Sequence, residues 1–305
     1  MLDLPALAEK LTGRMVYFEA DGGRICVLSN FMGHVLLGST DIPVDDPDGV
    51  ICDDGEVDYL LGAFARLFPK VPVDRSNIFF SYAGVRPLQA NNATDPGAIS
   101  RDHLISTLPP NRERRFPILS LIGGKWTTGR ALSAQAADEV LQHLGKRRSR
   151  PTEDLAIGGG VSLSQAAAPT EALLSSIVKD FGISRARAHQ LVARYGCRAR
   201  LVAASLSGDE TFLSSLPECS RQEIAYICDI EMVEHVEDFL FGRTSLFLQR
   251  PLDYVALMEL TETVADIRGW DSARKSTELQ RLIDRYRSLH RIDVPPQRGK
   301  KPQFL

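Results

Sequence analysis

The sequence lacks several features that would assign it to a common class of protein. Its 305 residues contain no uninterrupted apolar run of the roughly 18 residues that a membrane-spanning helix needs. The formal charge of −3 gives no excess of positive charge, which argues against nucleic acid as a partner. The five cysteines are widely spaced without a Cys-x-x-Cys pair, so neither a disulfide framework nor a zinc site is indicated. We expect a globular, metal-free, cytoplasmic protein, with a peripheral position at the inner face of the membrane as an alternative.

A dinucleotide-binding fingerprint is also missing. Such a fingerprint is a strand, a Gly-x-Gly-x-x-Gly turn and a helix, whose amino end holds the cofactor pyrophosphate. The only run of three glycines, Gly158-Gly159-Gly160, lies in a linker with no predicted strand ahead of it. The sequence therefore predicts no pyrophosphate-binding half within these 305 residues.

The most informative segment that is present is a glycine turn between a strand and a helix. Residues 118–122 are almost entirely apolar and lead into Gly123-Gly124, and Lys125 follows directly. Glycines allow a ligand to approach the backbone closely. The arrangement places a cation beside that point of approach.

The helix after this turn is predicted to begin near Thr127 or Thr128 and to end at Gly145. A threonine at the start of a helix caps it with its side chain, and other first-turn N–H groups stay available. Together with the positive end of the helix dipole, these groups suit an anion or an electron-rich carbonyl.

The chain is predicted to have two parts. Strands at 15–18, 24–28 and 35–40 form an antiparallel meander, and the apolar positions of 56–68 predict a helix that Pro69 ends. From about residue 170 the pattern is almost purely helical. The predicted fold class is α+β, with the boundaries in this order: 1–148, an α+β part; 149–290, an all-helical part; 291–305, a flexible tail.

Three further segments give the chain a family resemblance. Residues 77–88 are predicted to form a strand with Arg86 near its end, residues 98–103 a short extended piece with Arg101, and Gly38-Ser39-Thr40-Asp41 lies upstream. With the glycine turn, their order and spacing resemble the carboxyl half of the FAD-dependent glycerol-3-phosphate dehydrogenases.

This resemblance implies both a fold and an activity. The α+β part would be the antiparallel-sheet remnant of a D-amino-acid-oxidase-like flavin and substrate domain, and the helical part a carboxyl-terminal cap domain. The family oxidises sn-glycerol 3-phosphate to dihydroxyacetone phosphate with FAD and passes the electrons to quinone. The absent fingerprint suggests that a separate chain carries the dinucleotide-binding half or that the gene is truncated, and leaves activity of this chain alone open.

The resemblance also assigns roles to individual residues. Arginine forks suit phosphate oxygens, and a lysine beside a flavin would stabilise the negative charge that develops during its reduction. Neither the residues nor the resemblance identifies a catalytic base. The implied sites are as follows: substrate binding by Arg86, Arg101 and Lys125; catalysis by Lys125; FAD binding by Gly123, Gly124, Thr127 and Thr128.

Two other interpretations stay open. One is another FAD-dependent oxidase with the same strand, turn and helix. The second is a non-catalytic interaction or DNA-binding module, because residues 171–196 can form a helix-turn-helix with Arg185, Arg187 and Arg194 on its second helix. The acidic net charge disfavours the DNA-binding version.

Overall fold

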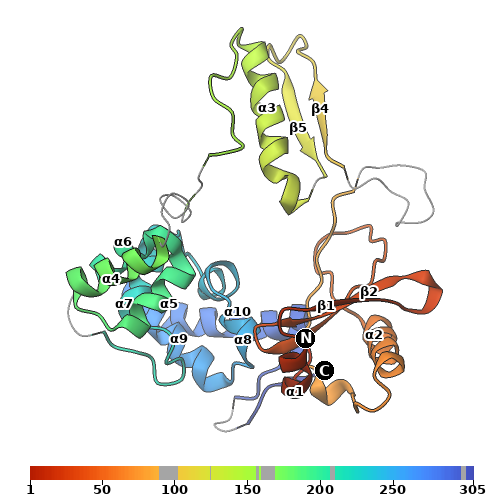
Figure 1. Ribbon diagram of the computed structural model, residues 1–305, viewed down its shortest axis with the longest axis vertical. Helices are drawn as coiled ribbons and strands as arrows, with labels where there is room; N and C mark the ends of the chain where they lie inside the picture. The colour runs from red at the N-terminus through yellow and green to blue at the C-terminus, as the bar shows by residue number, and fades with distance from the viewer. Residues whose placement is uncertain (89–101, 124, 156–157, 159–168, 207–209, 297–299) are drawn as a thin grey trace. The chain divides into compact units, whose positions relative to one another are not determined.

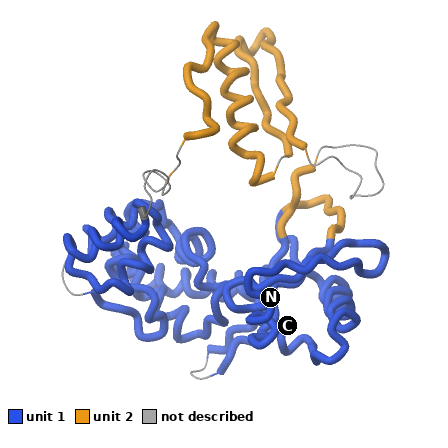
Figure 2. The backbone as a smooth tube through the Cα atoms, viewed as in Figure 1, with its two compact units in different colours: residues 1–40, 48–83, 162–305 blue, residues 41–47, 84–161 orange. Residues whose placement is uncertain are grey.

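The computed structural model describes all residues except 89–101, 124, 156–157, 159–168, 207–209 and 297–299 (Figure 1). It combines helices with small antiparallel sheets. The chain forms two compact units (Figure 2). Unit 1 consists of residues 1–40, 48–83 and 162–305, and unit 2 of residues 41–47 and 84–161.

The predicted meander is confirmed in unit 1. Its three strands pair in the order β1-β2-β3, all antiparallel, and the pairs Val16↔Leu28 and Leu28↔Leu37 fix their register. The strands are β1 (Met15–Glu19), β2 (Ile25–Phe31) and β3 (His34–Gly38).

The two faces of the meander differ in burial. Leu28 and Val35 are fully buried and pack in one cluster with Phe64 of helix α2 (Asp54–Leu67) and with helix α1 (Pro5–Lys10). On the opposite face, Met15, Tyr17 and Ile25 are each more than half exposed. Both faces of the meander therefore carry apolar residues. One face packs against α1 and α2, and the other leaves an apolar surface exposed.

Helix α2 confirms the predicted helix at 56–68 and begins two residues earlier. The Asp53 carboxylate accepts a hydrogen bond from the Glu56 N–H at 2.8 Å, and the Glu56 carboxylate accepts one from the Asp53 N–H at 3.0 Å. This reciprocal capping box fixes the helix start, and the helix ends at Leu67, two residues before Pro69.

The predicted helical remainder is confirmed in the described residues from 169 onward. Its main core surrounds Leu257 and Leu260 of α9, and a second cluster joins α4, α5 and α6. None of the helices in the described part of the chain is long and apolar enough to cross a membrane. The elements are α4 (Pro169–Phe181), α5 (Arg185–Tyr195), η6 (Gly196–Arg198), α6 (Ala199–Ser205), α7 (Arg221–Ile230), the π-helical turn η7 (Asp238–Arg243), α8 (Leu246–Gln249), α9 (Tyr254–Arg268) and α10 (Ser272–His290).

The strand predicted at 77–88 is not formed. After the short turn η2 (Arg75–Asn77), only Ile78 makes an isolated bridge, to Leu2. Phe79 and Phe80 are buried instead in the main helical core. Their aromatic side chains made the segment look like a strand, but contacts with distant helices determine its course.

The end of the chain differs from the predicted flexible tail. Strand β6 (Ile292–Asp293) pairs antiparallel with β7 (Gln303–Phe304), and Ile292 is buried. The Arg291 guanidinium donates to the Leu305 carbonyl oxygen at 2.9 Å. Strand pairing, burial and this hydrogen bond therefore hold the described residues at the two ends of the segment predicted to be flexible.

Unit 2 contains a two-stranded antiparallel sheet and one long helix. Strand β5 (Ile118–Ile122), predicted from the sequence, pairs with β4 (Leu104–Leu108). The turn η4 (Trp126–Thr128) then leads into α3 (Gly129–His143), and Gly145 follows with a positive φ of 66°. The predicted order of strand, glycine turn and helix is confirmed.

Candidate functional site

Gly123 is the point where the motif segments of unit 2 meet. Its φ is +71°, a conformation that glycine adopts without strain. A Cβ atom at this position would lie 3.2 Å from the carbonyl oxygen of Asp102 and 3.3 Å from that of Pro87. The backbones that follow Arg86 and Arg101 in the sequence therefore approach the glycine turn, as a shared site requires.

Replacing Gly123 with alanine tests this close approach. We expect a loss of stability of unit 2 greater than the roughly 1–2 kcal/mol of the left-handed conformation alone, because the new methyl group would crowd two carbonyl oxygens. Gly145→Ala is the matched control, since Gly145 has a similar φ of +66° but nothing within 4 Å of its Cβ position. Hydrogen exchange of the α3 amides measures both losses. Equal losses would contradict a role for close packing at Gly123.

Arg86 is held at its backbone and at its side chain. The Leu88 N–H donates to the Arg86 carbonyl oxygen at 2.9 Å across Pro87. Arg86 Nη1 donates to Asp41 Oδ2 at 2.7 Å, with side-chain exposures of 44% and 28%. The sequence analysis did not predict Asp41 as a site residue, although Asp41 ends the Gly38–Asp41 motif, which was the one sequence feature that could have pointed to it.

Lys125 is exposed at the start of η4, beside the fully exposed Trp126. The predicted threonine caps are wrong. Thr128 is the residue before α3, but its side chain does not cap the helix. Thr128 Oγ1 instead accepts a hydrogen bond from the backbone N–H of Lys125 at 3.2 Å and donates to the carbonyl oxygen of Lys125 at 3.1 Å. The intervening 3₁₀ turn directs this hydroxyl back toward Lys125, so Thr128 holds the backbone of the predicted catalytic residue.

Two of the predicted site residues, Arg101 and Gly124, lie outside the described residues. Thr127 is exposed within η4. The structure therefore brings together the chain segments around Arg86, Asp102 and Gly123, and the roles of the individual side chains stay predictions.

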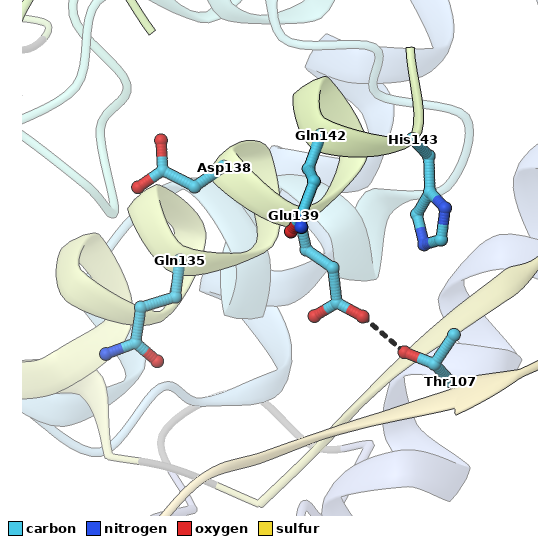
Figure 3. Close-up of a pocket in the computed structure, with 6 residues that line it drawn as sticks. All are labelled: Thr107, Gln135, Asp138, Glu139, Gln142 and His143. Atoms are coloured by element: carbon cyan, nitrogen blue, oxygen red, sulfur yellow. Dashed lines mark hydrogen bonds between the residues drawn. The ribbon is translucent and has the colours of Figure 1, made fainter. Parts of the chain in front are cut away.

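A surface depression in the described part of unit 2 lies between α3 and β4. It is shallow, and Glu139 of α3 hydrogen-bonds to Thr107 of β4 at its edge (Figure 3). Asp138 in its lining is paired with Arg148 at 2.7 Å, and none of the predicted site residues lines it. Its lining residues are Thr107, Gln135, Asp138, Glu139, Gln142 and His143.

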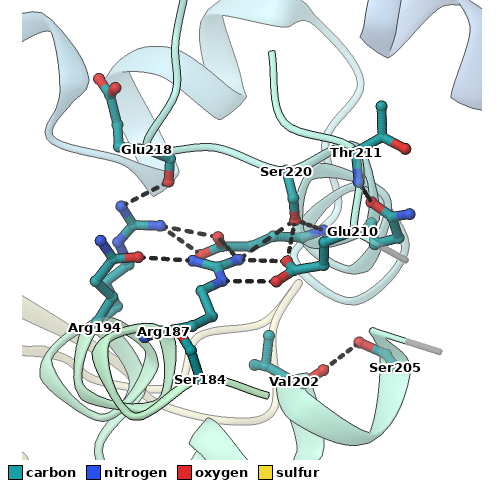
Figure 4. Close-up of polar contacts among 12 residues, drawn as sticks. Ser184, Arg187, Arg194, Val202, Ser205, Glu210, Thr211, Glu218 and Ser220 are labelled. Atoms are coloured by element: carbon teal, nitrogen blue, oxygen red, sulfur yellow. Dashed lines mark hydrogen bonds and ion pairs between the residues drawn. The ribbon is translucent and has the colours of Figure 1, made fainter. Parts of the chain in front are cut away.

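The arginines of the possible DNA-reading helix are engaged with carboxylates. Arg187, whose side chain is only 6% exposed, bonds to Glu210 at 2.7 Å and to Glu223 at 2.8 Å (Figure 4). Arg194 also bonds to Glu223, and Arg185 pairs with Glu171 on α4. The buried Arg187 cannot reach a DNA groove, and the more exposed Arg194 and Arg185 are already paired with carboxylates, so helix α5 does not support the DNA-binding alternative.

The environment of Glu223 keeps its carboxylate ionised. Burial alone would raise its pKa, but Arg194, the hydroxyl of Tyr195 and Arg187 outweigh burial and lower it. The pKa of Tyr195 is raised by burial and by the neighbouring Glu223. The cluster is therefore a network of opposite charges in which the hydroxyl stays protonated.

The cysteines and the described acidic groups offer no metal centre. None of the five cysteines forms a disulfide bond, and burial raises the pKa of the Cys219 thiol to about 12. Among the described residues, no group of three His, Cys, Asp or Glu side chains is arranged to hold a metal ion.

Comparison with known proteins finds a family similar to the helical part. Residues 150–275 match the C-terminal domain of alpha-glycerophosphate oxidase. This match covers helices α4 to α9 and the first residues of α10.

Most of the chain is similar to proteins named glycerol-3-phosphate dehydrogenase. The relative from Synechocystis sp. is 28% identical over 264 residues, which cover 82% of this chain and 45% of the relative. Glycerol-3-phosphate dehydrogenase 2 from Mycobacterium bovis is 27% identical, covering 83% and 42%, and the Pseudomonas aeruginosa protein is 29% identical, covering 70% and 41%. The chain thus spans less than half the length of these relatives and matches their carboxyl-terminal portion. The resemblance drawn from the sequence motifs is confirmed.

Proposed function

We propose that this chain supplies the substrate-binding part of an FAD-dependent glycerol-3-phosphate dehydrogenase. The reaction would convert sn-glycerol 3-phosphate to dihydroxyacetone phosphate and pass two electrons to quinone. The observation that carries the proposal is the packing of the Gly123 turn against the carbonyl oxygens of Pro87 and Asp102. This packing supports a shared site for the three proposed substrate-binding cations, Arg86, Arg101 and Lys125, because Pro87 and Asp102 directly follow two of them in the sequence. The names of the relatives give the same substrate.

The cations suit a substrate with a phosphate at one end. In this proposal Arg86 and Arg101 bind the phosphate oxygens, because guanidinium groups match them bidentately. Lys125 lies nearer the carbinol end and stabilises charge that develops during the reaction. Anchoring the phosphate favours glycerol 3-phosphate over the unphosphorylated substrates of another FAD-dependent oxidase.

The glycine turn fits the ring end of a flavin. Gly123 has no side chain, and the first N–H groups of η4 lie at a helix start, where electron-rich ring oxygens are favoured. When bound there, FAD would accept the hydride from the carbinol carbon. The remaining task of this chain is to hold the substrate, with Gly123, Gly124, Thr127 and Thr128 facing the ring.

The pyrophosphate end of FAD needs residues that this sequence does not offer. We propose that a separate chain carries the dinucleotide-binding half and packs on the exposed face of the meander. Met15, Tyr17 and Ile25 support this, because exposed apolar patches mark interaction surfaces. In this proposal residues 1–148 are the partial D-amino-acid-oxidase-like domain and 149–290 the cap domain, and the assembly works in the cytoplasm at the inner membrane face.

The purified chain alone is expected to be colourless and inactive. Mixed with a polypeptide that carries the dinucleotide-binding half of a relative, it should retain FAD and reduce a quinone analogue when glycerol 3-phosphate is added. Visible absorbance measures the flavin, and quinone reduction measures the activity.

Glycerol is the control substrate, since it has the carbinol but not the phosphate. Stoichiometric flavin on the chain alone would contradict the division of the cofactor site between two chains. Equal activity with glycerol and glycerol 3-phosphate would contradict the proposed phosphate anchor.

A further inference from the structure

Asp41 and Arg86 are 45 positions apart in the sequence but form one direct ion pair within unit 2. Arg86 Nη1 donates to Asp41 Oδ2 at 2.7 Å. The backbone of Arg86 is restrained as well, because Leu88 closes a tight turn over Pro87, whose ring fixes its own φ. The backbone of Arg86 is therefore restrained by the turn, and its guanidinium is restrained by Asp41.

Because both side chains of the Asp41–Arg86 pair are partly exposed, the pair serves to orient Arg86 rather than to stabilise the fold. The Arg86 side chain is 44% exposed and that of Asp41 is 28% exposed. An exposed ion pair of this kind adds little to folding stability. It does restrict a long side chain that otherwise samples many rotamers, and binding no longer has to restrict that motion.

We propose that Asp41 is a positioning residue that orients Arg86 toward the phosphate of the substrate; this inference rests on the proposed function of Arg86. A guanidinium has five N–H donors, so a carboxylate that engages Nη1 can set the direction in which the other donors point. The opposite role is physically distinct. A carboxylate that competed with phosphate for Arg86 would weaken binding, and its removal would tighten it.

Titration of sn-glycerol 3-phosphate into the ¹⁵N-labelled full chain, assembled with FAD and the polypeptide that carries the dinucleotide-binding half, tests the proposal. The Arg86 Nε–H signal, assigned by its loss in Arg86→Lys, reports the occupied site. We expect Asp41→Ala to weaken binding by about 2- to 10-fold, the range for loss of one immobilised long side chain. Asp41→Asn keeps an oxygen acceptor and should fall between the wild type and Asp41→Ala.

Asp138→Ala is the matched control, because it removes an ion pair of the same 2.7 Å length with Arg148 in the same unit. Its binding should equal that of the wild type, and both alanine variants should keep the wild-type unfolding midpoint. Unchanged or tighter binding in Asp41→Ala would overturn the positioning role alone. If the Arg86 signal of the wild type does not respond to glycerol 3-phosphate, the proposed function of Arg86 fails, and the positioning role fails with it.

Discussion

Replacing Glu223 with alanine is expected to lower the free energy of unfolding by about 3 to 5 kcal/mol, the usual cost of breaking a buried ion pair from one side. The Glu223 side chain is 3% exposed. It accepts hydrogen bonds from Arg187 at 2.8 Å, Arg194 at 2.9 Å and the Tyr195 hydroxyl at 2.6 Å. Alanine would leave the buried Arg187 with less compensation for its charge. Urea unfolding followed by circular dichroism measures the loss.

Glu171→Ala is the matched control, because it removes the carboxylate that pairs with Arg185 at 2.7 Å on the surface of the same domain. Both side chains of that pair are more than half exposed, so its removal should leave the unfolding midpoint nearly unchanged. Equal losses in the two variants would show that burial of the Glu223 network contributes nothing.

The pH dependence of stability gives the same network a second signature. The folded-state pKa of Glu223 lies below its ordinary value of 4.5. The unfolded state therefore binds the proton first, and the contribution of Glu223 is complete above that value and is lost as the pH falls through the folded pKa. Glu223→Gln, which keeps the shape of the side chain, should lose less stability on acidification than the wild type. An identical acid profile would contradict this linkage.

This network also shows where sequence reasoning about charge ends. Arg187 and Arg194 repeat along one helix and suggest a basic surface. The carboxylates that neutralise them belong to Glu210 and Glu223, 23 and 36 positions after Arg187. The sequence near helix α5 does not indicate these partners, because Glu210 lies in the loop before α7 and Glu223 lies on α7 itself.

The elements that were predicted correctly are those with a strong local pattern. The meander consists of short apolar strands separated by glycine turns, α2 has a capping box, and strand β5 runs into a glycine turn. The segment 77–88 failed because its composition is that of a strand, whereas Phe80 is buried among helices far along the chain. Local patterns define an element only where distant contacts agree with them.

The candidate site shows the same division. Gly123 was predictable, since a two-glycine turn before a helix signals a special backbone conformation. The Asp41–Arg86 pair was not, because it joins residues that only tertiary structure brings together. The threonine caps failed because the 3₁₀ turn η4 separates the glycine turn from α3. The order of the motifs in the sequence therefore predicted where the site lies, whereas the contacts between its side chains could be identified only from the structure.

In the assembled enzyme, Arg86→Ala and Lys125→Ala are expected to impair different steps. If Arg86 anchors the phosphate and the bound substrate and partner chain bury this pair, loss of Arg86 should weaken capture of glycerol 3-phosphate by about 2 to 5 kcal/mol, as expected when one partner of a buried charge pair is truncated. Turnover of free glycerol should hardly change. Lys125→Ala should slow flavin reduction itself, because its partner includes charge that develops only in the transition state. Stopped-flow measurement of flavin reduction against substrate concentration separates the two effects.

Arg148→Ala provides the control, since Arg148 is another ion-paired arginine of unit 2 and pairs with Asp138 away from the Gly123 turn. It should alter neither capture nor the reduction rate. If Arg86→Ala lowered activity with glycerol and with glycerol 3-phosphate equally, Arg86 would support the fold of the site rather than bind the phosphate. An unchanged reduction rate in Lys125→Ala would give Lys125 a structural role at the start of η4, because its backbone is already held there by Thr128. The two substitutions therefore test separately whether this chain anchors the substrate and whether it takes part in the chemical step.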